Sequence, residues 1–396
     1  MPLTLHPLLR EILNPRRLCE GAAISIAIVM LAFMFDQLAK AHGLLMASGQ
    51  PMFGDYIAFW SAGHLALEGK AALVHDRHAL TAVQQGLIVG MHVMAPWNSP
   101  PTFLLICTVL ALLPYGVSAM TFFVISAALF FTAAYKILPD KRALLFAVTL
   151  PAFLYHPGTV QVGVFIAGVS GLAIYWLDKR PRLAGSLVAL LAIKPHMALL
   201  WPLLLLISRR WTAFTAAAIA TTAFVLLGAL VFGVESYPRF FENLRASADL
   251  VTHRQVAAQT FASLYGDLIG LHVSIRTAAI AQAVSAVSAI LMACWIFWRG
   301  DRVTQGIALC AATLLISPYL FFYDFTLLAV SAALLSPPRN RLEFMAIIAA
   351  WLSALSVAAG FYMTLPYCAA AAWLMMIVAL RRVGSAASVP ALAPQL

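Results

Sequence analysis

The sequence has few charges, and acidic residues are the scarcest of them. Of its 396 residues only 15 are aspartate or glutamate and 10% are charged, whereas 63% are hydrophobic. A soluble domain of this length could not cover its surface with so few polar groups, but lipid favours an apolar exterior. The composition therefore excludes an ordinary soluble protein, and each polar group left at membrane depth is costly enough to need a reason.

Cysteine is scarce as well, with five residues in the chain. Cys107, Cys294, Cys310 and Cys368 lie inside apolar runs, and Cys19 lies at the start of one. No pair has the spacing of metal ligands, so the cysteines predict neither a disulfide framework nor a zinc site.

Basic residues outnumber acidic ones and give the chain a net charge of +10. Such an excess could indicate nucleic-acid binding, but the arginines and lysines occur in short clusters that flank apolar runs. Clusters of this kind follow the positive-inside rule of membrane proteins, so we expect a membrane as partner and no nucleic acid. The clusters are Arg16-Arg17, Lys179–Arg182, Arg209-Arg210, Arg339 with Arg341, and Arg381-Arg382.

The apolar runs predict an all-α, polytopic integral membrane protein with about 11 to 13 transmembrane helices. Two stretches, 43–98 and 234–275, are too polar for lipid and carry amphipathic helical patterns. We expect a single domain over residues 1–396, in which these stretches form a first and a second outer loop. The predicted spans are 18–42, 99–113, 116–136, 143–156, 160–177, 183–208, 212–233, 276–298, 303–320, 322–337, 343–360 and 363–380.

The segment 183–208 leaves the topology open, because Lys194-Pro195 interrupts it. If 143–156, 160–177 and 183–208 are three full spans, the cluster Lys179–Arg182 falls outside, against the charge rule. If 183–208 is instead two half-helices that meet at Lys194-Pro195, the cluster falls inside and one earlier segment must be re-entrant. Both alternatives indicate a site, since irregular backbone at membrane depth is tolerated only where protein or a cavity surrounds it.

The first outer loop is the part of the chain richest in candidate residues. Pro51 and Gly54 end the first span, and Asp55 then begins a helix. The dipole at a helix N-terminus favours an ionised carboxylate, so Asp55 suits a proton acceptor at the membrane surface. The alternative is that Asp55 only caps the helix, and Asp76 could likewise be a cap or turn residue. An Asp55–Asp76 pair could in principle hold a divalent ion, although no metal-ligand spacing links them to each other or to His64.

Further polar residues border the later apolar runs. Trp97 and Asn98 precede a double proline, and Trp97 also fits an interfacial aromatic belt. Lys194 is too far from the nearest basic cluster to reach water easily, so it needs an anionic partner. That partner could be a lipid phosphate or the carboxylate of a structural ion pair. A break in the apolar run near residues 317–324 leaves Asp324 at the membrane rim.

The second outer loop has a helical pattern with polar and aromatic faces. It contains Arg254 and Gln259 and fits a helix that lies on the membrane surface and closes over a ligand. A solvated lid without ligand contact is the alternative.

Taken in order, these motifs resemble those of glycosyltransferase family 87, from about residue 16 to 340. The resemblance implies an integral-membrane enzyme of the GT-C class. It would transfer a sugar, typically mannose, from a polyprenyl-phosphate donor to a lipid or glycan acceptor outside the bacterial cytoplasmic membrane, without a metal or other cofactor. The resemblance rests on Gly54-Asp55-Tyr56, Ala62-Gly63, Leu67-Glu68-Gly69, Ser99-Pro100-Pro101, Val160-Gln161, Gly185 with Lys194-Pro195, Arg209-Arg210-Trp211, Ser317-Pro318-Tyr319 and Tyr323-Asp324.

The resemblance also implies roles for single residues. Asp55 occupies the position of the general base, in a single displacement that inverts the anomeric carbon. Lys194 and Arg254 are the candidate cations for the donor phosphate. The candidate substrate-binding residues are Tyr56, His64, Asp76, Trp97, Asn98, His156, Gln161, His196, Gln259, Tyr319, Tyr323 and Asp324.

Two other classes of function fit part of the pattern. A transporter or flippase for a lipid-linked saccharide would also need buried cations and broken helices. The chain has no evident internal repeat, which counts against a transporter. A structural membrane scaffold would leave Lys194 and Asp324 unexplained.

Overall fold

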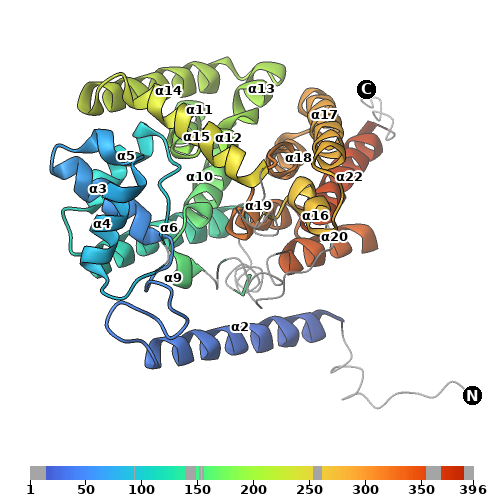
Figure 1. The fold of residues 1–396 in the computed structure, drawn as a ribbon. Helices are drawn as coiled ribbons and strands as arrows, with labels where there is room; N and C mark the ends of the chain where they lie inside the picture. The colour runs from blue at the N-terminus through green and yellow to red at the C-terminus, as the bar shows by residue number, and fades with distance from the viewer. Residues whose placement is uncertain are drawn as a thin grey trace, which may run out of the picture.

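The computed structural model describes residues 15–92, 94–138, 149–150, 153, 156–252, 261–353 and 367–387. These residues form helices joined by loops, with no β-strand among the elements of the described chain (Figure 1). The predicted all-α membrane fold is confirmed. The helices are α2 (Pro15–Ala39), α3 (Tyr56–Leu67), η1 (Ala71–Leu73), α4 (Arg77–Leu87), α5 (Pro101–Leu110), α6 (Tyr115–Ile137), α9 (His156–Thr159), α10 (Gly163–Trp176), α11 (Pro181–Ala189), η2 (Leu190–Ile193), α12 (Pro195–Ala198), α13 (Leu200–Ile207), α14 (Trp211–Phe232), α15 (Ser236–Thr252), α16 (Leu264–Gly270), α17 (Ile275–Arg299), α18 (Arg302–Ile316), η4 (Phe322–Phe325), α19 (Thr326–Leu335), α20 (Arg341–Leu352) and α22 (Tyr367–Ala387).

Five helices in the described part of the chain are long and apolar enough to cross a bilayer. They are α2, α6, α14, α17 and α22, and they agree with predicted spans to within a few residues. Only a small share of α2 and α14 is buried in protein, which fits helices that face lipid. The predicted span 143–156 and most of the segment between α20 and α22 lie outside the described residues.

The remaining apolar helices are too short to cross alone. The helices α10, α18 and α19 contain 14, 15 and 10 residues. At 1.5 Å per residue they cover about 15–23 Å, less than the roughly 30 Å of a hydrocarbon core. Nearly all their residues are buried, so protein rather than lipid surrounds them. These helices must therefore end inside the depth of the membrane.

The segment from α11 to α13 is a re-entrant hairpin. The Asp178 carboxylate, just before α11, lies 3.0 Å from Arg210 Nη2, just after α13, and 3.3 Å from Arg302 Nε. Both ends of the segment are therefore at one face of the molecule, and the chain turns at Lys194, where φ is −141° and ψ is 80°. This confirms the alternative in which 183–208 forms two half-helices. It also brings Asp178, Arg210 and Arg302 together at one face, as the positive-inside rule requires. We call this face the basic end.

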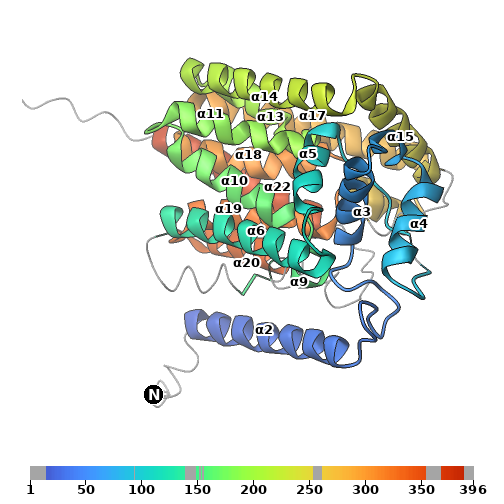
Figure 2. The same ribbon diagram turned by 90° about the vertical axis from the view of Figure 1, so that its left-hand side faces the viewer.

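The predicted span 99–113 does not cross the membrane. Thr102 Oγ1, at the start of α5, donates to the Ala192 carbonyl near the hairpin turn, 2.7 Å away. Beyond the end of α5, the Leu113 carbonyl accepts from Trp60 Nε1 of α3 at 2.9 Å. In Figure 2, α3 and α5 stand nearly upright, while α6, α10 and α14 run across the view. The apolar run of α5 thus reflects packing against α3 and α14 rather than a crossing of the membrane. It supplies the earlier non-crossing segment that the hairpin topology needs.

The hairpin makes a direct prediction for chemical labelling. In sealed vesicles, Lys179→Cys and Arg209→Cys should react with a membrane-impermeant maleimide from the same face, because both residues are exposed at the basic end. Glu68→Cys in the first outer loop should react from the opposite face, and the wild type gives the background of the native cysteines. Reaction of positions 179 and 209 from opposite faces would show that 181–207 crosses the membrane.

Candidate functional site

The ends of the short helices meet the first outer loop at one place. A Cβ on Gly54 would lie 2.7 Å from the Gly158 carbonyl oxygen, and a Cβ on Gly163 would lie 2.1 Å from that of Tyr323. Both distances are shorter than real Cβ contacts, so only glycine permits these approaches. The two glycines therefore hold three separate segments together, around residues 54–55, 158–163 and 323–324.

Asp55 precedes α3 but does not cap it. Its backbone is helical, with φ −65° and ψ −11°, and its side chain makes no cap hydrogen bond. Instead, Gln161 Nε2 donates to Asp55 Oδ2 at 2.8 Å across 106 positions of the chain. Asp76 provides the contrast, because its carboxylate accepts from Ala79 N at 2.9 Å and caps α4. The Asp55 carboxylate is thus held by a tertiary contact and not used for local structure.

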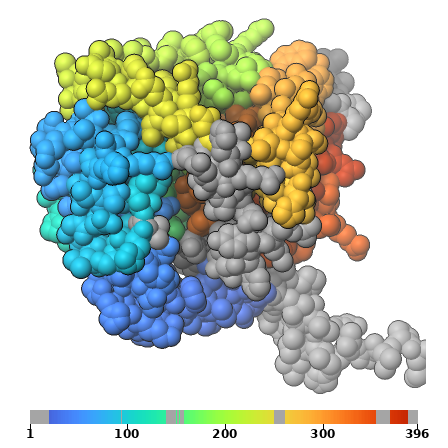
Figure 3. All heavy atoms as spheres, viewed as in Figure 1, coloured from blue at the N-terminus to red at the C-terminus, as the bar shows by residue number. Residues whose placement is uncertain are grey.

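Asp55 is exposed to solvent, and protein atoms also surround its carboxyl closely. The residue keeps an exposed surface, yet protein atoms surround the carboxyl closely enough that burial raises its pKa, while the hydrogen bond from Gln161 opposes the rise. We interpret this combination as a carboxyl in a recess that solvent reaches. Tyr115 and Tyr323 are both near enough to feel its charge. Figure 3 shows the face of the molecule that carries the first outer loop, α15 and α16.

The backbone is strained on both sides of this contact. Phe53, two residues before Asp55, has φ +66°, and Val160, directly before Gln161, has φ +41°. Positive φ is rare for residues other than glycine, and most of all for a β-branched residue such as valine. Strain of this kind costs on the order of 1–3 kcal/mol per residue and is concentrated at functional sites. The strain here indicates that the surrounding structure fixes both partners of the hydrogen bond.

A buried ion pair includes Asp324, the residue directly after Tyr323. Lys194 Nζ, at the turn of the hairpin, is 2.5 Å from Asp324 Oδ1 and lies over the ring of Tyr323, 4.8 Å from its centroid. The Asp324 side chain is fully buried, the Lys194 side chain is 15% exposed, and Asp324 Oδ2 also accepts from Phe321 N at 3.1 Å. Of the two partners considered for Lys194, the structure shows the carboxylate. A role in phosphate binding stays a prediction.

Two more polar atoms at the site are buried without a partner among the described residues. They are Thr159 Oγ1, in the segment that touches Gly54, and His196 Nε2, close enough to Lys194 to feel its charge. A buried polar atom without a hydrogen bond is costly, so either atom would gain from a hydrogen bond with a ligand.

Comparison with known proteins gives a family. A model of glycosyltransferase family 87 matches residues 97–318, which is more than half of the chain. The chain belongs to glycosyltransferase family 87. It is therefore a membrane glycosyltransferase, as the order of its motifs predicted. No curated protein and no solved structure gives a significant match.

The matched region of this family 87 protein contains part of the site. It includes Gln161 and the hairpin with Lys194, but it begins after Asp55 and ends before Asp324. The family match and the hydrogen bond from Gln161 to Asp55 are thus separate observations, and the second joins the first outer loop to the matched core.

Some predicted residues of the first outer loop make contacts that stabilise the fold. The hydroxyl of Tyr56 is 2.6 Å from Ser118 Oγ in the buried contact with α6. His64 stacks on Trp60 at 4.9 Å and lies 3.4 Å from Glu68. These contacts, like the cap that Asp76 provides for α4, are structural, and a substrate role of the three residues stays a prediction.

Other predicted residues connect the two outer loops. Asn243 Nδ2 of α15 donates to the Trp97 carbonyl at 3.0 Å and to Asn98 Oδ1 at 2.8 Å. Tyr319 is partly exposed and packs its ring at 5.5 Å from that of Phe261. Arg254, Gln259 and the side chain of His156 lie outside the described residues, so their roles stay predictions.

The sequence interpretation missed two residues at the site, Tyr115 and Thr159. The hydroxyl of Tyr115, at the start of α6, donates to the Met52 carbonyl at 2.5 Å and so fixes the loop before Asp55. Tyr115 lies between the predicted spans 99–113 and 116–136. No local pattern distinguishes it from other interfacial tyrosines. Among the described residues, no group of three or more His, Cys, Asp or Glu could hold a metal ion.

The buried ion pair makes a prediction for stability. Lys194→Met should lower the free energy of unfolding by roughly 3–5 kcal/mol, because it leaves Asp324 buried and uncompensated. The double variant Lys194→Met/Asp324→Leu should recover most of the loss. Lys40→Met, which removes an exposed pair with Asp36, serves as control and should cost less than about 1 kcal/mol. Thermal unfolding in detergent measures all four proteins, and equal melting temperatures for the wild type and Lys194→Met would contradict the pair.

Proposed function

We propose that this family 87 enzyme transfers a sugar, with mannose the first candidate, from a polyprenyl-phosphate donor to a hydroxyl of a lipid or glycan acceptor. The reaction takes place on the outer side of the bacterial cytoplasmic membrane, with inversion at the anomeric carbon and Asp55 as general base. The observation that supports it most is the Asp55 carboxylate. It is accessible, it does not cap its helix, and Gln161 orients it.

One carboxylate is enough for this chemistry. Asp55 accepts the proton of the acceptor hydroxyl while that oxygen forms a bond to the anomeric carbon. The bond between the anomeric carbon and the phosphate oxygen breaks, and the phosphate leaves with the electron pair. A single displacement inverts the centre, so a β-linked donor gives an α-linked product. Retention would require a second carboxylate as nucleophile.

The leaving phosphate needs a cation but no general acid, because it is stable as an anion at neutral pH. Lys194 is the first candidate, since its ammonium group has more than one hydrogen to donate and Asp324 occupies one direction only. The nearby unpartnered His196 Nε2 could receive or donate a further hydrogen bond. Arg254 in the second outer loop is the other candidate. The mechanism requires no cofactor besides the donor lipid.

The short helices support a lipid-linked donor. The turn at Lys194 and the ends of α10 and α18 lie inside the depth of the membrane by their length. A donor whose isoprenoid chain stays in lipid could bring its phosphate to this depth without crossing the bilayer. A transporter of a lipid-linked saccharide would also use a re-entrant hairpin, but membership of family 87 favours transfer.

The base assignment predicts the effect of a conservative substitution. Asp55→Asn should lower the rate of sugar transfer by about 10²–10⁴-fold, the range for loss of a general base. Asp76→Asn is the matched control, because asparagine also caps helices well and Asp76 is an exposed cap in the same loop. The assay uses reconstituted enzyme with polyprenyl-phosphate mannose and a panel of lipid acceptors. Normal transfer by Asp55→Asn would exclude Asp55 as the base.

The hydrogen bond from Gln161 predicts a change in the pH profile. It stabilises the charged form of Asp55 and opposes the effect of burial on its pKa. Without it the pKa should rise further, and since the base must be ionised, kcat/KM should begin to fall at a higher pH on acidification. Gln161→Leu should therefore move the acid limb upward, while Asp76→Asn leaves it in place. An unchanged acid limb in Gln161→Leu would show that the amide does not tune the base.

A further inference from the structure

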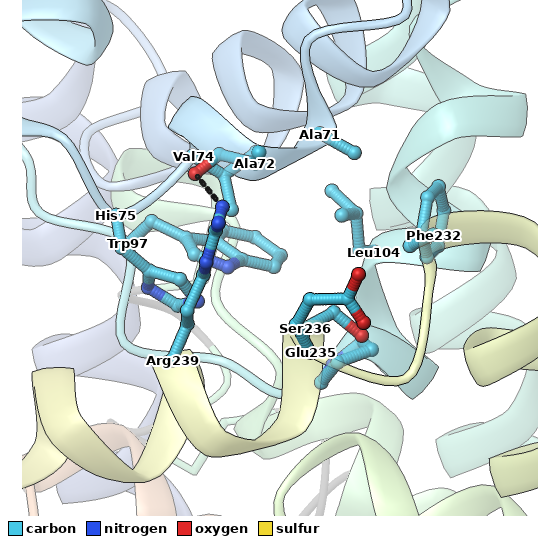
Figure 4. Close-up of a pocket in the computed structure, with 11 residues that line it drawn as sticks. Ala71, Ala72, Val74, His75, Trp97, Leu104, Phe232, Glu235, Ser236 and Arg239 are labelled. Atoms are coloured by element: carbon cyan, nitrogen blue, oxygen red, sulfur yellow. Dashed lines mark hydrogen bonds between the residues drawn. The ribbon is translucent and has the colours of Figure 1, made fainter.

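A cavity with apolar and charged lining residues lies where the two outer loops meet. It has a volume of about 100 Å³ and is lined by η1 and the residues after it, the first turns of α5, and the junction of α14 and α15 (Figure 4). One water needs about 10–15 Å³ by the same measure, so the cavity has room for several. It belongs to the outer loops and is separate from the recess at Asp55.

Two charged side chains in this cavity are spaced to pair with each other but do not. Glu235 and Arg239 are four residues apart at the start of α15, the spacing at which ion pairs usually form along a helix. Arg239 Nη1 instead donates to the Ala72 carbonyl of the first outer loop at 3.3 Å. The Glu235 carboxylate has no hydrogen-bond or ion-pair partner among the described residues, and Figure 4 shows it directed into the cavity beside Leu104.

The composition of the lining selects the kind of ligand. Glu235 can only accept hydrogen bonds and Arg239 can only donate them, so a ligand that contacts both must do both with neighbouring atoms. The two charges cancel, and burial lowers the pKa of His75, which keeps its imidazole neutral at pH 7. An anion would be repelled by Glu235 and a cation by Arg239. Leu104 and Phe232 form an apolar side, which suits the carbon face of a ring.

We propose that this cavity binds one neutral sugar ring of the acceptor, through adjacent hydroxyl groups held by Glu235 and Arg239. The proposal rests on the proposed function, in that the acceptor carries a glycan. The bound sugar is not the one that reacts, because the ring of Trp97 in the cavity wall packs on Phe59 at 6.2 Å. Phe59 lies one helical turn after Asp55, so an aromatic layer separates the cavity from the base. Binding energy from such a remote part of a substrate can help to position the reacting group.

The test measures binding of simple sugars to the full chain. The protein is placed in phosphatidylcholine nanodiscs, since sugar-headed detergents would compete. Methyl α-D-mannopyranoside, methyl α-D-glucopyranoside and methyl α-D-galactopyranoside are the neutral probes, and mannose 1-phosphate is the charged one. Saturation-transfer NMR detects the weak binding expected of a single ring, with Kd on the order of 1 mM.

We expect at least one neutral probe to bind the wild type. Glu235→Ala and Arg239→Met should each weaken binding by about fivefold or more. Glu242→Ala, which changes an exposed glutamate on the same helix, should bind like the wild type. The proposal is overturned if no neutral probe binds, if Glu235→Ala binds the neutral probes normally, or if Arg239→Met weakens the binding of mannose 1-phosphate more than that of the neutral probes. This experiment measures sugar binding, whereas the proposed function is tested by the transfer activity of Asp55→Asn. The failure of one can therefore be distinguished from the failure of the other.

Discussion

A lysine at membrane depth must meet an anion, and the pairing of Lys194 with Asp324 is the constraint on which the rest of the site depends. The lysine lies at the turn of a hairpin that enters from the basic end and returns to it, and the aspartate precedes the short helix α19. Neither segment could end inside the bilayer if its polar group stayed unpaired. The ion pair thus allows several short helices to stop at the same depth.

The first outer loop contacts this core through Gly54 and Asp55. Gly54 allows it to touch the chain at Gly158, and the hydrogen bond from Gln161 fixes the Asp55 carboxylate against the core. The protein accepts left-handed backbone at Phe53 and Val160 to do so. A carboxylate that caps a helix is held by its own segment, so its position does not depend on contacts with the core. Asp55 is held instead by a residue more than a hundred positions away, so its carboxylate is in place only when the loop and the core are assembled.

Composition and periodicity predicted the fold class, the long spans and the break at Lys194-Pro195, because these depend on local hydropathy and on proline. They wrongly predicted a transmembrane span at α5, because burial against α3 and contact with lipid favour the same apolar residues. They also left open whether Asp55 was a cap, because a cap and a catalytic carboxylate occupy the same position in a sequence. The partner of Lys194 could not be deduced either, as 130 positions separate it from Asp324 and no local pattern links the two. Long-range pairings of this kind become visible only in three dimensions.

The most direct test is a structure of the full-length Asp55→Asn protein with a polyprenyl-phosphate sugar bound in a lipid nanodisc. The account predicts that the phosphate lies beside the hairpin turn at Lys194, with the anomeric carbon between the phosphate and the side chain at position 55. A sugar bound away from position 55, or a phosphate on the same side of the anomeric carbon as that residue, would contradict it.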